Sequence, residues 1–292
     1  MSICADRTVI ITGAGGGLGR AYALAFAAQG ANVVVNDIRA EAAEDVAGEI
    51  RANGGQAIAN SDDITTLVTA QRIVDAALAA FGEVHVLINN AGVLRDRMFI
   101  SLSEEDWDMV MRVHLKGHYC LANILGRRWR DLAKAGTPVD ARIINTSSGA
   151  GLQGSVGQAN YSAAKGGIAA LTLVQAAELA RYGVTANALA PAARTSMTES
   201  AMPDVVKKPE DGSFDAWAAE NVAPLVVWLG SAASAHVSGQ VFESQGGRIS
   251  LGDGWRTGVT RDKGALWRVE EIGEAVNAIL AEAPKAQRVW GS

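Results

Sequence analysis

Short apolar segments alternate with longer helical segments along most of this chain, and this alternation limits the folds that it can adopt. The apolar segments are typical of strands buried on both faces, whereas the segments between them are rich in Ala and Leu at helical spacing. Such alternation predicts an α/β fold with a doubly wound parallel sheet of about seven strands and helices on both faces. Ligands bind at the carboxyl ends of the strands in such sheets.

Seven segments are expected to form the strands, and they are Thr8–Thr12, Asn32–Asn36, Gln56–Asn60, Val84–Asn89, Arg142–Thr146, Val184–Leu189 and Gln240–Glu243. The expected helices include Leu18–Gln29, Ala40–Ala52, Thr66–Phe81 and Gln158–Tyr182. No linker rich in Pro, Gly or Ser divides the chain, so residues 1–250 are predicted to form a single domain.

Two later segments depart from this alternation. Residues 192–215 contain Pro203, Pro209 and Gly212, which interrupt any long helix and suit a mobile connection near the ligand site. We interpret them as a substrate lid. Residues 251–292 begin Gly-rich and end in an amphipathic helix near Val269–Glu282, and this extension is expected to pack on the core or on a neighbouring subunit.

The composition argues against several function classes. A net charge of −5 disfavours a general attraction to nucleic acid or to an anionic membrane. The apolar stretches are shorter than the roughly 20 residues that cross a bilayer, and no secretory signal precedes Thr8. Cys4 and Cys120 are far apart, so they indicate neither a disulfide framework nor a metal site. We therefore expect a cytoplasmic protein without a metal ion.

A glycine-rich turn lies where the first strand gives way to the first helix. Gly13, Gly17 and Gly19 allow a tight turn and a close approach of the backbone to a pyrophosphate, which the amino end of the helix would face. Leu18 lies within the turn and is expected to border the same ligand. The spacing differs from the common G-x-G-x-x-G, and such a loop alone is also typical of a flexible turn. At this junction it predicts a Rossmann fold that binds a dinucleotide.

An acidic residue at the end of the second strand bears on which dinucleotide is bound. Asp37 follows Gly19 by 18 positions, where a carboxylate can accept hydrogen bonds from the adenosine ribose hydroxyls and would repel a 2′-phosphate. This favours NAD over NADP, although the nearby Arg39 points the other way and Asp37 could instead cap a helix. Asp63 and Ile64 come after the third strand and are expected at the cofactor site, where Asp63 could bind the adenine amino group.

Tyr161 and Lys165 lie four residues apart in a helical segment, which places their side chains on one face, one turn apart. A tyrosine phenol has an ordinary pKa of about 10, and a nearby ammonium that stabilises the phenolate makes it a better proton shuttle near neutral pH. Taken alone, the pair is also typical of ordinary surface helix residues.

These features together resemble the short-chain dehydrogenase/reductase family over about residues 5–250. The shared features are the glycine turn, the Asn-Asn-Ala-Gly run at residues 89–92, Ser148, and the Tyr161–Lys165 pair, in that order and spacing. The resemblance implies that Tyr161 is the catalytic acid or base, and that Lys165 binds the nicotinamide ribose and lowers the pKa of the tyrosine. Ser148, which precedes Tyr161 by 13 residues, would orient the substrate oxygen in preference to Ser147.

The same resemblance implies further cofactor contacts. Asn90, with Ala91 and Gly92, would support the central strand and line the cofactor site. The hydroxyl that meets the nicotinamide carboxamide would belong to Thr195 or Ser196, and we favour Thr195.

Two positions depart from the family pattern. His114 stands where the family usually has an asparagine that bends a helix and helps to hold a proton-relay water. The histidine could preserve the relay through its backbone carbonyl, titrate near neutral pH, or be packed without a catalytic part. After the sixth strand, Pro191 at the cofactor site is followed by Ala192 where the family has glycine, so the backbone there has lost freedom.

A longer resemblance narrows the substrate. Residues 19–26, 33–37, 90–97, 157–165 and 223–229 look like one branch of the family, the dehydrogenase part of peroxisomal multifunctional enzymes of type 2. That branch oxidises (3R)-hydroxyacyl-CoA, can act on 17β-hydroxysteroids, and also has histidine at the position of His114. The resemblance implies an NAD-dependent oxidoreductase that interconverts a secondary alcohol and a ketone. Its substrate would be a 3-hydroxyacyl-CoA or a hydroxysteroid, including a steroid-derived acyl-CoA.

Two alternatives stay open at this point. One is an NADP-linked 3-oxoacyl reductase of lipid synthesis, and the other is a non-catalytic regulator that senses NAD. The complete set of Ser148, Tyr161 and Lys165 argues against the regulator, because a sensor needs no proton shuttle. Family members are commonly homodimers or homotetramers, so the resemblance also implies a second copy of the chain as partner.

Overall fold

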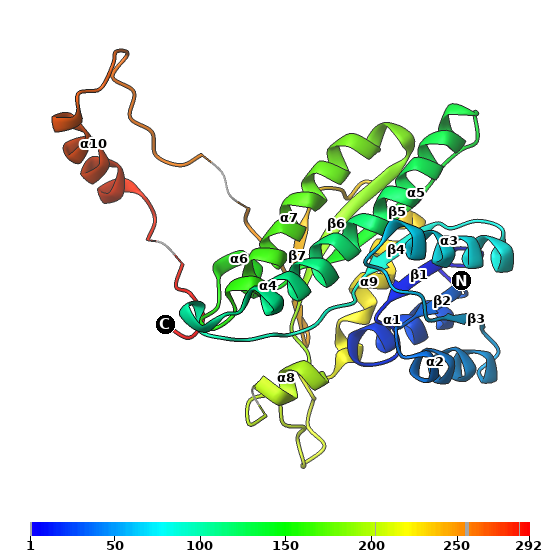
Figure 1. The fold of residues 1–292 in the computed structure, drawn as a ribbon. Helices are drawn as coiled ribbons and strands as arrows, with labels where there is room; N and C mark the ends of the chain where they lie inside the picture. The colour runs from blue at the N-terminus through cyan, green and yellow to red at the C-terminus, as the bar shows by residue number, and fades with distance from the viewer. Residues whose placement is uncertain (1, 202, 255–256, 286) are drawn as a thin grey trace.

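An eight-stranded sheet forms the centre of the protein (Figure 1), whose computed structural model describes residues 2–201, 203–254, 257–285 and 287–292. The strand order is β3-β2-β1-β4-β5-β6-β7-β8, with β1 to β7 parallel and β8 antiparallel to β7. The strands are β1 Thr8–Thr12, β2 Asn32–Asn36, β3 Gln56–Asn60, β4 Val86–Asn89, β5 Ala141–Thr146, β6 Val184–Pro191, β7 Val241–Gln245 and β8 Arg248–Leu251. The order reverses direction at β1 and β4, which is where doubly wound sheets bind their ligands.

The α-helices are α1 Gly17–Ala28, α2 Ala40–Ala52, α3 Leu67–Phe81, α4 Glu104–Met111, α5 Gly117–Lys134, α6 Gly149–Gln153, α7 Ala159–Leu179, α8 Ser196–Ala201, α9 Ala223–Gly230 and α10 Val269–Glu282. Each strand and helix expected from the sequence coincides with one of these elements. The boundaries agree within two residues, once the 3₁₀ turn Ala180–Tyr182 is counted with α7. The predicted α/β doubly wound fold is therefore confirmed. None of the described helices is both long enough and apolar enough to cross a bilayer.

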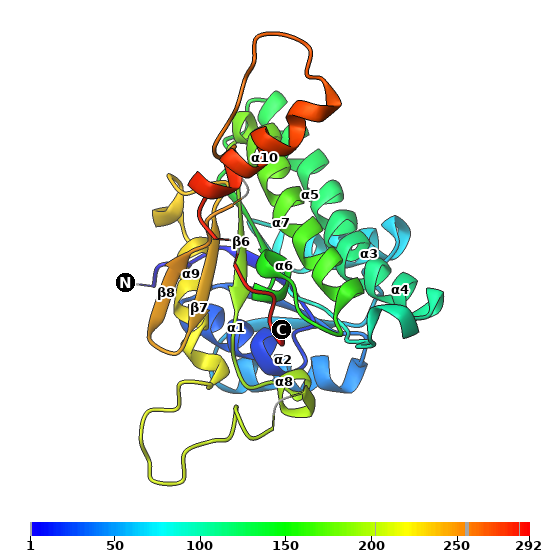
Figure 2. The ribbon, with the colours of Figure 1, turned by 90° about the vertical axis from the view of Figure 1, so that its left-hand side faces the viewer.

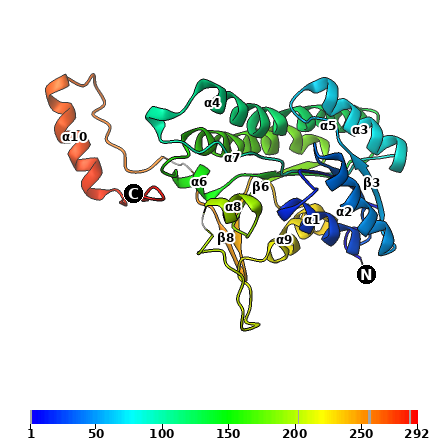
Figure 3. The same cartoon turned by 60° about the horizontal axis from the view of Figure 1, so that its bottom comes forward.

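The core lies on both faces of the sheet because successive residues of a strand point to opposite sides. Val9 and Ile11 of β1 pack on one face, whereas Ile10 between them packs on the other. Helices α1, α2 and α9 cover the first face, and α3, α5 and α7 cover the second (Figure 3). This burial on both faces explains why the strands are continuous apolar runs.

The seven parallel strands agree with the predicted count of about seven, and the antiparallel eighth strand was not expected. β8 turns back along β7 after Gly246 and Gly247, and Gly246 has φ +53°. A positive φ suits the tight turns of two-residue hairpins. Figure 2 shows β7 and β8 together at the edge of the sheet. β8 is largely exposed and contains polar residues, so it lacks the apolar run that marks a buried strand.

The segments interpreted as a lid and as an extension have distinct shapes. Residues 192–215 include the short helix α8, and their ends meet in an ion pair between Arg194 and Asp215. α10 stands away from the sheet (Figure 1), and none of its residues is buried. After α10 the chain returns to the body near α6. The lid and the boundary at residue 250 stay predictions.

We predict that Trp129 on α5 is a major contributor to the stability of the second face. Its side chain is 1% exposed, and its Nε1 donates a hydrogen bond of 2.8 Å to the Val84 carbonyl. Trp129→Ala should lower the free energy of unfolding by about 3–5 kcal/mol through the cavity that it creates. Trp129→Phe keeps much of the packing and should cost about 1–2 kcal/mol for the lost hydrogen bond. Denaturant unfolding of both variants measures this, and equal losses would contradict the packing argument.

Candidate active site

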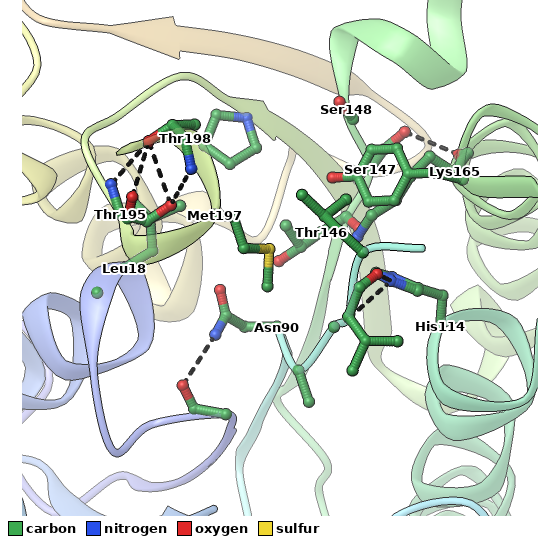
Figure 4. Close-up of a pocket in the computed structure, with 18 of the residues that line it drawn as sticks. Leu18, Asn90, His114, Thr146, Ser147, Ser148, Lys165, Thr195, Met197 and Thr198 are labelled. Atoms are coloured by element: carbon green, nitrogen blue, oxygen red, sulfur yellow. Dashed lines mark hydrogen bonds between the residues drawn. The ribbon is translucent and has the colours of Figure 1, made fainter. Parts of the chain in front are cut away.

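A cavity of about 1520 Å³ lies at the carboxyl ends of the parallel strands. In Figure 4, Leu18, Asn90 and Met197 lie on one side of this space, and Ser148, Lys165 and His114 lie on the other. The cavity is lined by every site residue predicted from the sequence except Gly19, namely Gly13, Gly17, Leu18, Asp37, Asp63, Ile64, Asn90, Ala91, Gly92, His114, Ser148, Tyr161, Lys165, Pro191 and Thr195.

In the glycine turn, neighbouring backbone segments approach so closely that side chains would not fit between them. Gly13 has φ +62° and Gly17 has φ +51°, a region that favours glycine. A Cβ at Gly19 would lie 2.2 Å from the Gly13 carbonyl oxygen, and one at Gly13 would lie 2.8 Å from the Ala91 Cα. Gly19 therefore lets α1 start directly beneath the turn, although it does not line the cavity itself.

Asn90 ties the end of β4 to this turn. Its Nδ2 donates hydrogen bonds to the carbonyls of Thr12, at 3.0 Å, and Gly13, at 3.3 Å. The Thr12 Oγ1 in return accepts from the backbone N–H groups of Asn90 and Ala91, at 2.9 and 3.0 Å. These reciprocal bonds fix the gap between β1 and β4, where the expected cofactor would lie.

Asp37 closes β2 beside the turn and is 6% exposed. Its Oδ2 accepts from the Gly15 backbone N–H at 3.0 Å, and its Oδ1 accepts from the Arg39 backbone N–H and Nε at 3.0 and 3.1 Å. The Arg39 side chain is 66% exposed, and its hydrogen bond with Asp37 raises the Arg39 pKa. The two residues that bear on cofactor choice are thus in direct contact.

The remaining predicted cofactor residues lie along the cavity wall. Asp63 accepts hydrogen bonds of 2.8 Å from the backbone N–H and the hydroxyl of Thr65, which orient its carboxylate. Ile64 is buried against α5, where a Cβ at Gly117 would lie 2.6 Å from its Cδ1. Pro191 ends β6, and the Thr195 N–H donates to the Thr198 hydroxyl at 2.8 Å.

These residues fit a nicotinamide dinucleotide. The turn presents backbone N–H groups at the start of α1, as pyrophosphate binding requires. Asp37 supplies acceptor oxygens at the end of the neighbouring strand. The cavity exceeds the roughly 300–1,000 Å³ of common ligand sites, so it has room for a dinucleotide together with a substrate.

Tyr161 is placed by the first turn of α7, and burial raises the pKa of its phenol. The Ser148 hydroxyl opposes this shift, because a hydrogen bond from it lowers the pKa of the phenol. The negative charge of Asp96 raises the same pKa by a smaller amount. The neighbouring Ser147 faces elsewhere, since its hydroxyl donates to the Lys165 carbonyl at 2.8 Å. This arrangement supports the preference for Ser148 over Ser147.

Lys165 is 2% exposed, and its Nζ donates a hydrogen bond of 2.5 Å to the Thr146 carbonyl. The same Nζ lies 5.5 Å from the centre of the Tyr161 ring. Burial lowers the pKa of this ammonium to about 7. The effect that opposes the raised pKa of Tyr161 in the structure is the Ser148 hydrogen bond, rather than the Lys165 charge expected from the sequence.

His114 is buried in a π-helical turn, Arg112–Lys116, between α4 and α5. Its ring meets the Tyr161 ring edge to face at 5.2 Å, and a Cβ at Gly92 would lie 2.4 Å from its Cε1. Its Nε2 lies 2.8 Å from the Val93 carbonyl oxygen and 3.0 Å from the Val93 nitrogen. Burial lowers the His114 pKa to about 3, so the imidazole is neutral at neutral pH. Titration near neutral pH, one of the three expectations, is therefore not supported.

Sequence reasoning missed a second buried histidine one turn further along. His118 is completely buried, and the carbonyls of His114 and Asn89 lie near enough to favour its protonated form. Neither ring nitrogen completes a hydrogen bond of good geometry within the described part of the chain. Burial keeps the His118 pKa well below its usual value.

Several cavity-lining residues also gave no signal in the sequence. They come from the segment after the predicted lid, the β7–β8 hairpin and the end of the chain, and they include Trp217, Glu243, Arg248, Ser250, Trp290 and Gly291. They lie far from the motifs in sequence, and no local spacing connects them to the candidate catalytic residues.

Known proteins share these features. Residues 7–205 match the short chain dehydrogenase family. The chain is 46% identical to hydroxyacyl-CoA dehydrogenase ChsB1 of Mycobacterium tuberculosis, over 84% of this chain and 79% of that protein. It is 42% identical to peroxisomal multifunctional enzyme type 2 of Mus musculus, and the match covers 85% of this chain and 32% of that longer enzyme. This confirms the resemblance predicted from the sequence.

A solved structure agrees with the computed one. The crystal structure of a short chain dehydrogenase from Mycobacterium avium superposes with a TM-score of 0.91 at 51% identity, and it covers 99% of this chain and 100% of that one. The fold, the site and the relatives together show that the chain is an oxidoreductase of the short-chain dehydrogenase family, whose members use NAD(H) or NADP(H).

Proposed function

We propose that this protein oxidises the secondary alcohol of a 3-hydroxyacyl-CoA to a ketone, in a reversible reaction with NAD. The observation that carries the proposal is the convergence of Ser148, Tyr161 and Lys165 on the cavity that the glycine turn also lines. A hydroxysteroid, including a steroid-derived acyl-CoA, belongs to the same proposal because it offers the same reacting group.

The protein's own residues would control the proton. When bound, the nicotinamide supplies the hydride chemistry. Tyr161 accepts the hydroxyl proton of the alcohol during oxidation and returns it during reduction. The Ser148 hydroxyl, beside the phenol, holds the substrate oxygen in line with Tyr161. A phenolate at Tyr161 favours the ammonium form of Lys165, because its Nζ lies 5.5 Å from the ring centre and opposite charges stabilise each other.

His114 would support this machinery without exchanging protons itself. Its neutral ring packs between Gly92 and the Tyr161 ring, and it holds the Val93 backbone. The π-helical turn that contains it is a type of irregularity often found at functional sites. We propose that His114 orients Tyr161 and shapes the space behind Lys165.

The size of the cavity and the relatives support the substrate class. A volume of about 1520 Å³ leaves space beside a dinucleotide for a bulky apolar substrate. A hydroxyacyl-CoA dehydrogenase is among the most similar relatives. The CoA portion would extend beyond the reacting carbon toward the mouth of the cavity.

Asp37 supports NAD as the cofactor, because its buried carboxylate would meet the ribose hydroxyls and repel a 2′-phosphate. Arg39 favours the second candidate, an NADP-linked 3-oxoacyl reductase, because a guanidinium at this edge can bind a phosphate. Asp37 engages Arg39 in the structure, and this contact leads us to favour NAD. A non-catalytic NAD sensor would have no use for a serine hydroxyl that lowers the pKa of the Tyr161 phenol.

We also propose that the chain forms a homodimer or homotetramer. Tyr119 on α5 and Leu173 and Val174 on α7 expose 42%, 51% and 50% of their surface. They lie along two neighbouring helices, where a second copy could cover them.

The central test is turnover of 3-hydroxyacyl-CoA thioesters and hydroxysteroids, followed by the absorbance of NADH near 340 nm. We expect Tyr161→Phe to lower kcat/KM by about 10²–10⁴, because it removes the proton acceptor. NADH affinity, measured by fluorescence titration, should stay close to that of the wild type. Tight NADH binding by the wild type with no turnover of any alcohol would favour the sensor and refute the proposal.

The raised pKa of Tyr161 predicts an alkaline pH profile. Oxidation needs the phenolate, so below the phenol pKa the value of kcat/KM should fall about tenfold per pH unit as the pH drops. Ser148→Ala removes the hydrogen bond that lowers this pKa, so its inflection should move to higher pH. Ser147→Ala is the matched control, because Ser147 bonds to the Lys165 carbonyl instead. An unchanged inflection in Ser148→Ala would contradict the assignment.

Cofactor choice should depend on the Asp37–Arg39 pair. Asp37→Ser should lower kcat/KM with NAD about 10- to 100-fold, the effect of losing hydrogen bonds to a charged group. The same change should improve the use of NADP, because repulsion is removed and Arg39 is released. The double variant Asp37→Ser/Arg39→Ser should lose that gain. If the wild type already prefers NADP in steady-state kinetics, the proposed role of Asp37 is wrong.

A further inference from the structure

The last residues of the chain lie on the loop that joins the two catalytic segments. This loop, residues 154–158, connects α6, which follows Ser148, to α7, which begins just before Tyr161. The Trp290 backbone N–H donates to the Gly154 carbonyl at 3.2 Å, and the Val156 N–H donates to the Trp290 carbonyl at 2.9 Å. Trp290 and Ser155 thereby form a short parallel bridge. Figures 1 and 3 show the carboxyl terminus returning to α6 after α10.

The indole of Trp290 occupies the space beside Gly149, the residue after Ser148. A Cβ at Gly149 would lie 2.3 Å from the indole Cη2 and 2.7 Å from its Cζ2, closer than real Cβ contacts allow. The indole therefore depends on the missing side chain at Gly149. The three atoms nearest to such a Cβ all belong to this ring.

Trp290 also faces the cavity that holds the catalytic residues. It lines the same space as Ser148, Val156 and Tyr161, yet 49% of its surface is exposed. Tryptophan offers a large rigid apolar surface to a ligand at a low cost in conformational entropy. A half-exposed indole that lines the cavity is therefore suited to contact the apolar part of a substrate.

We propose that Trp290 is a specificity-determining residue, which forms the wall against which the apolar portion of the alcohol substrate packs next to Ser148. The inference rests on the proposed function and adds a preference for substrates with a long acyl chain or fused rings. Such a contact lies away from the reacting carbon. It should therefore act mainly through substrate binding, and so through KM more than kcat.

The attachment of the tail explains why one ring can have this effect. α10 contributes no buried residue, so it does not fasten the tail to the body. The tail is held by the bridge to residues 154–156 and by small contacts such as Val289 against Gly154 and Gly291 against Val156. Displacing the indole from Gly149 should therefore remove the wall without disturbing the glycine turn or the sheet.

The test uses the full chain with Trp290→Ala, Trp290→Phe and Gly149→Ala, assayed on 3-hydroxybutyryl-CoA and 3-hydroxydecanoyl-CoA with NAD. We expect Trp290→Ala to lower the ratio of kcat/KM for the long over the short substrate by about tenfold, which is the order expected for one lost aromatic contact. Trp290→Phe should recover part of the ratio. Gly149→Ala should reproduce the loss by displacing the ring, and the double variant should be no worse than Trp290→Ala, because both changes remove one contact.

Controls separate this inference from the proposed function. Trp267→Ala alters another tryptophan of the same extension, which lies beside Lys263 outside the cavity lining, and should keep the wild-type ratio. Decanoyl-CoA binding in the presence of NADH, measured by calorimetry, gives a readout without turnover. Equal affinity of the wild type and Trp290→Ala for decanoyl-CoA would overturn the role of Trp290. Failure of the wild type to oxidise either thioester would instead count against the proposed reaction.

Discussion

Gly19 has no room for a side chain, because the Gly13 carbonyl lies 2.2 Å from where its Cβ would be. This close approach brings α1 directly under the turn after β1 and lets Asn90 reach the same turn from β4. The gap between β1 and β4 is thereby fixed by backbone contacts and one amide. The cavity, the ends of β5 and β6 and helix α7 are all arranged around that gap.

Burial then determines the charges of the candidate catalytic groups. It raises the pKa of Tyr161, lowers that of Lys165 to about 7, and keeps His114 neutral with a pKa of about 3. Each shift moves a group away from its charged form, because an apolar environment disfavours charge. A proton can therefore move between Tyr161 and its surroundings without a fixed charge at His114. The opposing effect of the Ser148 hydroxyl on the Tyr161 pKa makes that serine part of the electrostatics of the site.

Most of the fold was predictable from the sequence because local patterns encode it. Apolar runs such as Thr8–Thr12 are buried on both faces, and the helices between them repeat at helical spacing. Part of the cavity lining was predictable as well, since the glycine turn, Asn90 and Ser148 each follow the carboxyl end of a parallel strand and the Tyr161–Lys165 pair lies on α7. The pKa shifts of Tyr161, Lys165 and His114 were not predictable, because they depend on how deeply each group is buried.

The features that escaped prediction lack a local pattern. β8 is an exposed edge strand, so its residues need not alternate or be apolar. His118 lies one turn after His114, but nothing in its neighbours indicates that both its ring nitrogens are enclosed.

Trp290 lies 141 positions after Gly149, and the role of each residue can be recognised only from the contact between them. Gly149 by itself is typical of a turn, and Trp290 by itself is an aromatic residue near a chain end. The glycine beside Ser148 therefore has two explanations, backbone freedom or space for a distant side chain, and the collision of an added Cβ with the indole favours the second.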